Sequence, residues 1–172
     1  MGVLGRQVAG AFASLGFPVN GYSRSAHTDA RIKCYAESGG VGDFAAFMRA
    51  TRVLIILAPL TPATQDYFDQ ESLSLLQPSS YVINVARGGL LVDDALLELL
   101  DSGHIAGAAL DVFRVEPLPA QHRFWTHPKV HITPHISAIT IIGPSAQQVA
   151  QKIRQLENGE QVSGVIDRAR GY

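Results

Sequence analysis

The chain has 172 residues, and its 15 Asp and Glu residues nearly balance its 14 Lys and Arg residues, so the formal net charge is −1. Hydrophobic residues make up 47% of the sequence and charged residues 17%. This composition excludes a disordered chain and argues against binding of nucleic acid through a basic surface. The longest apolar run, at 53–59, has the length of a strand and is too short to span a membrane. The length predicts one domain that can bury a substantial core.

The cysteine content and the N-terminus both bear on the cellular compartment. Cys34 is the one cysteine, so no internal disulfide can form, and we expect a buried free thiol in a reducing environment. The N-terminal residues lack the basic region and the long apolar core of a signal peptide. We therefore expect a cytoplasmic protein.

The first predicted element is a helix over 5–15. Val8, Phe12 and Leu15 recur at helical spacing and should face the core, and Gly16 stands where a C-terminal cap is expected. A strand is predicted over 18–23. Three apolar residues then predict a second, short helix: Phe44, Phe47 and Met48.

The middle of the chain alternates strands and helices. Three segments are continuously apolar, as in a parallel sheet with helices on both faces, at 53–58, 81–86 and 105–112. Between the last two strands, Asp93 is expected to cap a helix that ends at Gly103. The core face of this helix consists of Leu96, Leu97 and Leu100. This order predicts an α/β fold with a doubly wound parallel sheet of the Rossmann type.

The pattern changes after Phe113. Four prolines exclude a long helix here: Pro117, Pro119, Pro128 and Pro134. We expect a loop with one short strand at 129–133, followed by a helix that starts at a capping box of Ser145 and Gln148. That helix should end at Asn158 and Gly159, and the tail over 162–172 could add a strand. Its buried side chains are expected to be Val149, Ile153 and Leu156.

Gly2 and Gly5 open the first helix at the spacing of the last two glycines of a dinucleotide-binding loop. Such glycines let the backbone approach a pyrophosphate, which the N–H groups of a helix N-terminus attract. At the end of the strand over 18–23, an acidic residue would bind the ribose of NAD, but this chain has Ser23, Arg24 and Ser25. A guanidinium flanked by hydroxyls suits the 2′-phosphate of NADP. An exposed loop charge is the alternative for Arg24, and a chance spacing is the alternative for the glycines.

Only Met1 precedes Gly2, so the strand that should lead into this loop is missing from the sequence, together with the loop's first glycine. In the strand order 3-2-1-4-5-6, that strand is central. Its loss would leave two strands without their neighbour and with unpaired edges. We therefore expect the fold to be incomplete at its N-terminus, and the chain alone to be weakly stable and catalytically poor.

Three residues that could reduce a carbonyl group follow predicted strands. Arg87 follows the strand at 81–86, Glu116 follows the strand at 105–112, and His135 follows the strand at 129–133. The carboxyl ends of parallel strands form the ligand-binding edge of such a sheet. A histidine can donate a proton near pH 7, a carboxylate can keep it charged, and an arginine can bind an anionic substrate.

These segments resemble the cofactor-binding part of the D-isomer-specific 2-hydroxyacid dehydrogenase family, and within it the bacterial glyoxylate/hydroxypyruvate reductase branch. The matching segments are MGVLGRQVA, YSRS, LAPLTPAT, INVARGG, GAALDVFRVEPLP, HPKVHITPHISAIT and DRARGY. The spacings of 29 residues from Arg87 to Glu116 and 19 from Glu116 to His135 also agree with the family. The resemblance implies reduction of a small 2-keto acid, glyoxylate or hydroxypyruvate, with NADPH in preference to NADH.

The resemblance also implies a role for each site residue. Arg87 would hold the substrate carboxylate and polarise the keto oxygen, His135 would donate the proton, and Glu116 would keep His135 protonated. Asp111 would bind the nicotinamide amide. The remaining cofactor-binding residues would be Gly2, Val3, Leu4 and Gly5 at the pyrophosphate, Ser23, Arg24 and Ser25 at the ribose, and Leu57, Ala58 and Val85 along the groove, with Arg87 and His135 also near the cofactor.

The family pattern predicts residues 1–138 as the NAD(P)-binding domain and 139–172 as a segment that completes the substrate domain. It also implies a homodimer. Two alternatives stay open: another reaction of the family, such as that of D-lactate or phosphoglycerate dehydrogenase, and a non-catalytic dinucleotide-sensing protein. A metal site at His127, His131 and His135 is disfavoured, because Pro128 and Pro134 exclude the helix that would align them. Trp125 could reach the substrate pocket or pack beneath its loop, and we expect it to pack beneath the loop.

Overall fold

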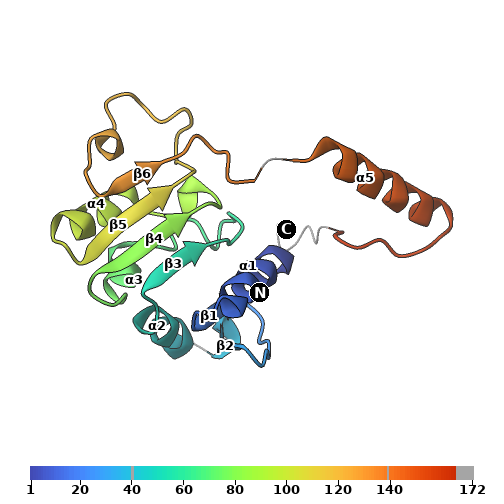
Figure 1. Cartoon of the computed structure of the whole chain (residues 1–172), viewed down its shortest axis with the longest axis horizontal. Coiled ribbons are helices and arrows are strands. Elements are labelled where there is room, and N and C mark those ends of the chain that lie inside the picture. The colour runs from blue at the N-terminus through green and yellow to red at the C-terminus, as the bar shows by residue number, and fades with distance from the viewer. Residues whose placement is uncertain (40, 139, 166–172) are drawn as a thin grey trace. The chain divides into compact units, whose positions relative to one another are not determined.

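The computed structural model describes residues 1–39, 41–138 and 140–165, which form two compact units (Figure 1). The first unit comprises Met1–Pro134, and the second begins at His135. Each unit is described by itself. In the described part of the chain, no helix is both long and apolar enough to cross a membrane.

The first unit contains six parallel strands in two sheets. The smaller sheet pairs β1 with β2, and the larger has the order β3-β4-β5-β6. The bounds are β1 Val19–Ser23, β2 Ile32–Ala36, β3 Val53–Ile56, β4 Ser80–Asn84, β5 Ile105–Leu110 and β6 Val130–Ile132. The parallel α/β fold expected from the sequence is confirmed. Four of these strands lie within predicted segments, and β4 begins one residue before its predicted segment.

Sequence patterns missed β2, whose five residues include the charged Lys33. Cys34 lies in this strand and is half-buried, whereas we expected a buried thiol. The reason is that β2 pairs with β1 alone among the described residues, so it is an edge strand.

The break between the two sheets lies where the expected strand order lacks its central strand. In the described residues, β1 pairs with β2 and β3 pairs with β4, and no ladder joins β1 to β3. Asn20 in β1 instead donates a side-chain hydrogen bond of 3.0 Å to the carbonyl of Ala50, just before β3. At this break, β1 and β3 therefore each have one edge that no strand in the described chain covers.

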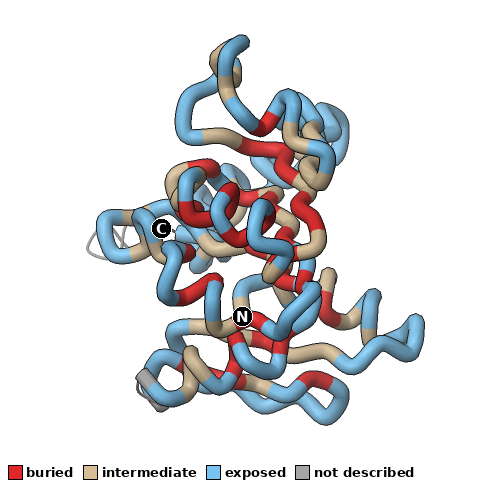
Figure 2. Tube along the Cα trace, turned by 90° about the vertical axis from the view of Figure 1, so that its left-hand side faces the viewer, coloured by how far each residue is buried: buried red, intermediate tan, exposed pale blue. Residues whose placement is uncertain are grey.

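Helices pack against the strands of both sheets and share the hydrophobic core with them. They are α2 (Val41–Arg49), α3 (Gln70–Ser74) and α4 (Asp93–Asp101), with short 3₁₀ helices η1 (Glu37–Gly39), η2 (Gly88–Leu90) and η3 (Arg123–Trp125). In α4 the predicted face of Leu96, Leu97 and Leu100 is buried, and Gly103 adopts a positive φ of 79° just beyond the helix. In Figure 2 the buried positions lie mainly in the first unit, which contains the hydrophobic core cluster.

Asp93 does not cap α4, contrary to expectation. The N-cap is Val92, without a side-chain hydrogen bond, and Asp93 is the first helical residue. Its carboxylate faces Arg114 and His122 instead, at 3.7 and 3.4 Å. Two partners outside the helix, a guanidinium and an imidazole, thus take the place of the capping bond.

Helix α1 spans Val3–Ser14 and buries only Ala9 among its residues. The predicted core face is wrong, since Phe12 is 39% exposed and Leu15, just after the helix, is 73% exposed. Gly16 ends the helix with a φ of 86°, as predicted. Helix α1 contacts β1 and β2, but Phe12 and Leu15 stay largely outside this contact.

The second unit contains α5, which spans Ile142–Glu157. It begins before the predicted capping box at Ser145, and its N-cap is Ile141. The three side chains expected to be buried are exposed by at least half: Val149 at 57%, Ile153 at 50% and Leu156 at 61%. Gly159 closes the helix at a φ of 72°, as predicted. The residues up to Val165 form no strand, and 166–172 lie outside the described residues.

Candidate active site

The carboxyl ends of the four strands of the larger sheet lie in one row. The ladders align Ile56 with Asn84, Asn84 with Leu110, and Leu110 with Ile132. The residues that follow each strand therefore meet at one edge of the sheet: Leu57 and Ala58 after β3, Val85 and Arg87 after β4, Asp111 after β5 and Thr133 after β6. This places most of the predicted groove and substrate residues together, as the fold type requires.

A buried asparagine shapes the turn that carries Arg87. Asn84, fully buried at the end of β4, accepts a hydrogen bond from the N–H of Ala86 at 3.1 Å and donates one to the carbonyl of Arg87 at 3.0 Å. Arg87 is exposed and caps η2 with extended backbone. The Asn84 amide thus stabilises the turn, and the guanidinium of Arg87 donates a hydrogen bond of 2.6 Å to the carbonyl of Ala86.

The loop after β5 packs directly against this turn. A Cβ added to Gly88 would lie 1.9 Å from the carbonyl carbon of Phe113 and 2.4 Å from the amide nitrogen of Arg114. Only a glycine lets the two backbone segments approach so closely. The Arg87 turn and the loop that carries Glu116 are therefore in contact.

Two carboxylates occupy this loop and its start. Glu116 is exposed, and its Oε1 accepts a hydrogen bond of 2.9 Å from the N–H of Phe113. Asp111 is 3% exposed, and its Oδ1 accepts the hydroxyl of Thr133 at 2.5 Å. Glu116 is thus held near the strand end, and Asp111 is bonded to the residue after β6.

His135 is the first residue of the second unit and is exposed. It adopts a positive φ of 54°, a conformation uncommon in residues other than glycine. The first unit therefore brings together Arg87, Asp111 and Glu116, while His135 follows the last strand of the same sheet on the adjoining unit.

The predicted pyrophosphate and ribose residues lie at the start of α1 and the end of β1. Gly2 is the N-cap of α1, whose first turn contains no acidic residue. Ser23 ends β1, and its hydroxyl donates to the carbonyl of Ser25 at 2.9 Å. Arg24, between them, is exposed. A helix N-terminus without acidic side chains and an exposed guanidinium fit the phosphates of a dinucleotide.

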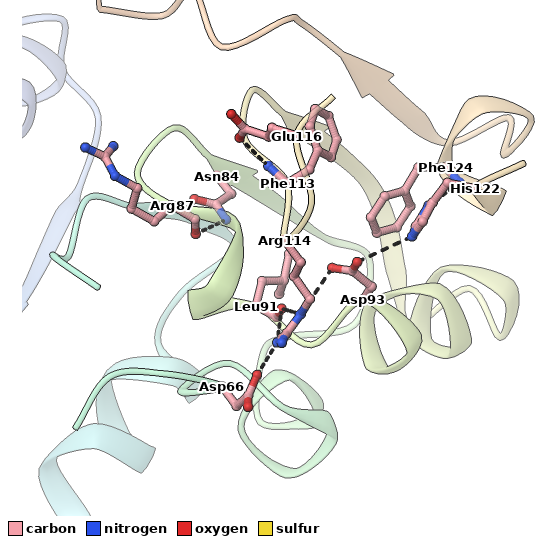
Figure 3. A network of polar contacts seen from close by, with 10 residues as sticks. All are labelled: Asp66, Asn84, Arg87, Leu91, Asp93, Phe113, Arg114, Glu116, His122 and Phe124. Atoms are coloured by element: carbon pink, nitrogen blue, oxygen red, sulfur yellow. Dashed lines mark hydrogen bonds and ion pairs between the residues drawn. The ribbon is translucent and has the colours of Figure 1, made fainter. Parts of the chain in front are cut away.

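A polar network supports the same loop from the side opposite Glu116 (Figure 3). Arg114 forms ion pairs with Asp66 and Asp93, and His122 lies 3.4 Å from Asp93. Burial raises the pKa of Asp93 above its ordinary value, although the charges of Arg114 and His122 act in the opposite direction.

Sequence reasoning missed three residues of this region: Asn84, Arg114 and Thr133. An asparagine at a strand end before a glycine turn is a signal that could have identified Asn84. Arg114 and Thr133 have no such signal, because their partners lie 21 or more residues away.

Two other residues, Trp125 and His127, form hydrogen bonds with backbone groups of the segment between β5 and β6. The indole N–H of Trp125 donates to the carbonyl of Pro119 at 3.0 Å, although the side chain is half exposed. The imidazole of His127 accepts the N–H of Lys129 at 3.2 Å and faces Asp101 at 3.3 Å.

The family model of the D-isomer specific 2-hydroxyacid dehydrogenase, NAD binding domain, matches residues 1–137. The chain belongs to this family. It is 43% identical over 171 residues to glyoxylate/hydroxypyruvate reductase A of Photorhabdus laumondii, an alignment that covers 99% of this chain and 54% of that protein. The chain thus spans about half the length of this curated relative.

Solved structures of the family are similar in fold. An NADPH-dependent glyoxylate/hydroxypyruvate reductase from Sinorhizobium meliloti, in complex with NADP and sulfate, matches with a TM-score of 0.94 and 37% identity, covering 100% of this chain and 55% of that one. A D-isomer specific 2-hydroxyacid dehydrogenase from Xanthobacter autotrophicus, in complex with NADPH and MES, matches with a TM-score of 0.93 and 38% identity, covering 98% and 69%.

Proposed function

We propose that this chain carries the cofactor-binding and catalytic residues of a reductase that converts a small 2-keto acid, glyoxylate or hydroxypyruvate, into the 2-hydroxy acid with NADPH. The observation that carries the proposal is the packing of the Arg87 turn against the Glu116 loop at Gly88, at the carboxyl edge of the sheet. The names of the Photorhabdus laumondii and Sinorhizobium meliloti relatives support the substrate class.

Each residue would act on a stated atom. The guanidinium of Arg87 would bind the substrate carboxylate and polarise the keto oxygen. His135 would donate the proton to that oxygen, and Glu116 would hold His135 in its protonated form. NADPH, when bound, supplies the hydride to the carbonyl carbon and is oxidised to NADP⁺.

The cofactor would lie along the strand ends. The N-terminus of α1 at Gly2, Val3, Leu4 and Gly5 would bind the pyrophosphate, and Ser23, Arg24 and Ser25 would bind the 2′-phosphate. Leu57, Ala58 and Val85 would line the groove, and Asp111 would orient the nicotinamide amide. By family resemblance, we also propose a homodimer in the cytoplasm.

The test is a fusion in which residues 1–172 replace the matched part of the Photorhabdus laumondii reductase, assayed for NADPH oxidation with glyoxylate and hydroxypyruvate. His135→Ala should lower kcat by about 10²–10⁴-fold, as expected for loss of a general acid. Arg87→Ala should lower kcat/KM by about 10²–10³-fold. Arg52→Ala, at an exposed arginine before β3, is the matched control and should change neither value.

Cofactor choice is tested separately. Arg24→Ala should raise the KM for NADPH about tenfold or more and leave the KM for NADH unchanged, because it removes a charge-assisted bond to the 2′-phosphate alone. A folded fusion that binds NADPH but reduces neither substrate would contradict the proposed reaction and favour a sensor. Faster reduction of another 2-keto acid would contradict the proposed substrate.

A further inference from the structure

We propose that Arg114 is a positioning residue, which holds the loop carrying Glu116 in place against the Arg87 turn. The role of Glu116 rests on the proposed function, whereas the structural part of the proposal does not. Arg114 has no role in the family resemblance described above. Its assignment comes from its contacts alone.

The guanidinium of Arg114 connects the loop after β5 to two other segments, the one from Leu91 to Asp93 and the one that contains Asp66. Its Nε and Nη2 both donate to the carbonyl of Leu91, at 2.9 and 2.6 Å. Nη2 also pairs with the carboxylate of Asp66, and Nε lies 3.7 Å from Asp93. The side chain is only 32% exposed, so solvent screens these contacts less than at an open surface.

Arg114 holds both ends of the short helix that follows Arg87. Its backbone and that of Phe113 rest on Gly88, the first residue of η2. Its side chain binds the carbonyl of Leu91, the residue that ends η2. The loop after β5 is thereby fixed to the Arg87 turn at two points.

Glu116 depends on this arrangement. Its carboxylate accepts the N–H of Phe113, the residue directly before Arg114. Figure 3 shows Glu116 and Arg87 on one side of the cluster and Asp66 on the other, with Arg114 between them. If Arg114 releases Leu91, Phe113 and Glu116 lose the support that sets their position relative to Arg87.

The first test measures hydrogen–deuterium exchange in the full 172-residue chain. Arg114→Ala should speed exchange of the Phe113 amide about tenfold or more, because bonds to a charged group are lost. Arg114→Lys should restore part of the protection, since an ammonium replaces the charge but not the planar fork. Unchanged exchange rates in β4 show that each variant is folded.

Arg123→Ala is the matched control. Arg123 also pairs with an aspartate, Asp101 at 2.8 Å, but its side chain is 62% exposed and its partner lies at the end of α4. It should leave exchange at Phe113 unchanged. Equal protection of Phe113 in the wild type and in Arg114→Ala would overturn the proposal.

The second test uses the reductase fusion. Arg114→Ala should lower kcat and leave the KM for NADPH unchanged. It should also move the alkaline limb of the kcat/KM profile to lower pH, and Glu116→Gln should move this limb in the same direction. In a Glu116→Gln background, Arg114→Ala should add less than a twofold effect. Additive losses, or an unchanged pH profile, would overturn the positioning role. A wild-type fusion without reductase activity would count against the proposed function alone, and the exchange result would then decide this proposal.

Discussion

Tyr22 illustrates how single side chains join the two sheets of the first unit. It belongs to β1, its ring lies 5.2 Å from that of Phe44 and 5.5 Å from that of Phe47, and its hydroxyl is 3.2 Å from that of Tyr67. Burial first, and the bond to Tyr67 second, raise the pKa of Tyr22 well above its ordinary value of 10.0. The aromatic cluster thus stabilises the neutral phenol.

The raised pKa of Tyr22 predicts how stability depends on alkaline pH. The folded state holds this proton more tightly than the unfolded state, so the stabilisation is complete below pH 10 and is lost as the pH rises above it. In an absorbance titration, one of the five tyrosines should ionise late, and Tyr22→Phe should remove that phase. Tyr81→Phe, at a tyrosine that is 47% exposed, should leave it intact. Loss of the late phase in Tyr81→Phe instead would contradict the assignment.

At the scale of elements, the contact between η2 and the loop after β5 sets the geometry of the candidate site. Neither segment contains more than three consecutive residues of regular secondary structure, the three being those of η2. They are positioned by a buried asparagine, a glycine without room for a side chain, and an arginine that binds a carbonyl. Close backbone packing of this kind tolerates no added volume.

Gly88→Ala should therefore lower the free energy of unfolding by roughly 3 kcal/mol or more, the upper range for overpacking. The added methyl group would meet backbone atoms of Phe113 and Arg114, which cannot rotate away. Gly10→Ala is the control. Gly10 lies inside α1, and a Cβ added there would meet no atom within 4 Å beyond the helix's own nearby backbone. This substitution should stabilise the protein by about 0.5–1 kcal/mol. Urea unfolding of both variants checks this, and equal effects would contradict the packing interpretation.

At the scale of the whole molecule, apolar surface lies beside the break between the two sheets. Val3 is 68% exposed, Leu4 56% and Leu15 73%, and Val53 in β3 is 49% exposed. The uncovered edges of β1 and β3 belong to the same unit. Exposed strand edges and apolar patches of this kind favour association or binding of another chain.

We expect the 172-residue chain alone to bind a hydrophobic fluorescent dye and to unfold at low urea concentration, because part of its apolar surface lacks a partner. The fusion with the Photorhabdus laumondii segment should suppress dye binding and raise the midpoint of unfolding. A chain that binds no dye and unfolds at the same urea concentration as the fusion would contradict this expectation.

Local patterns in the sequence were sufficient to predict every observed strand except β2, the helix at Leu96 and the α/β fold, because continuous apolar runs and helical periodicity reflect burial within one element. The same patterns predicted which residues follow the strand ends. They failed for the apolar sides of α1 and α5, since periodicity shows that a face is apolar but not that a partner covers it. The support of Glu116 by Arg114, the use of Asp93 as an ion-pair partner and the close packing at Gly88 depend on segments brought together by folding, and no local pattern contains that information.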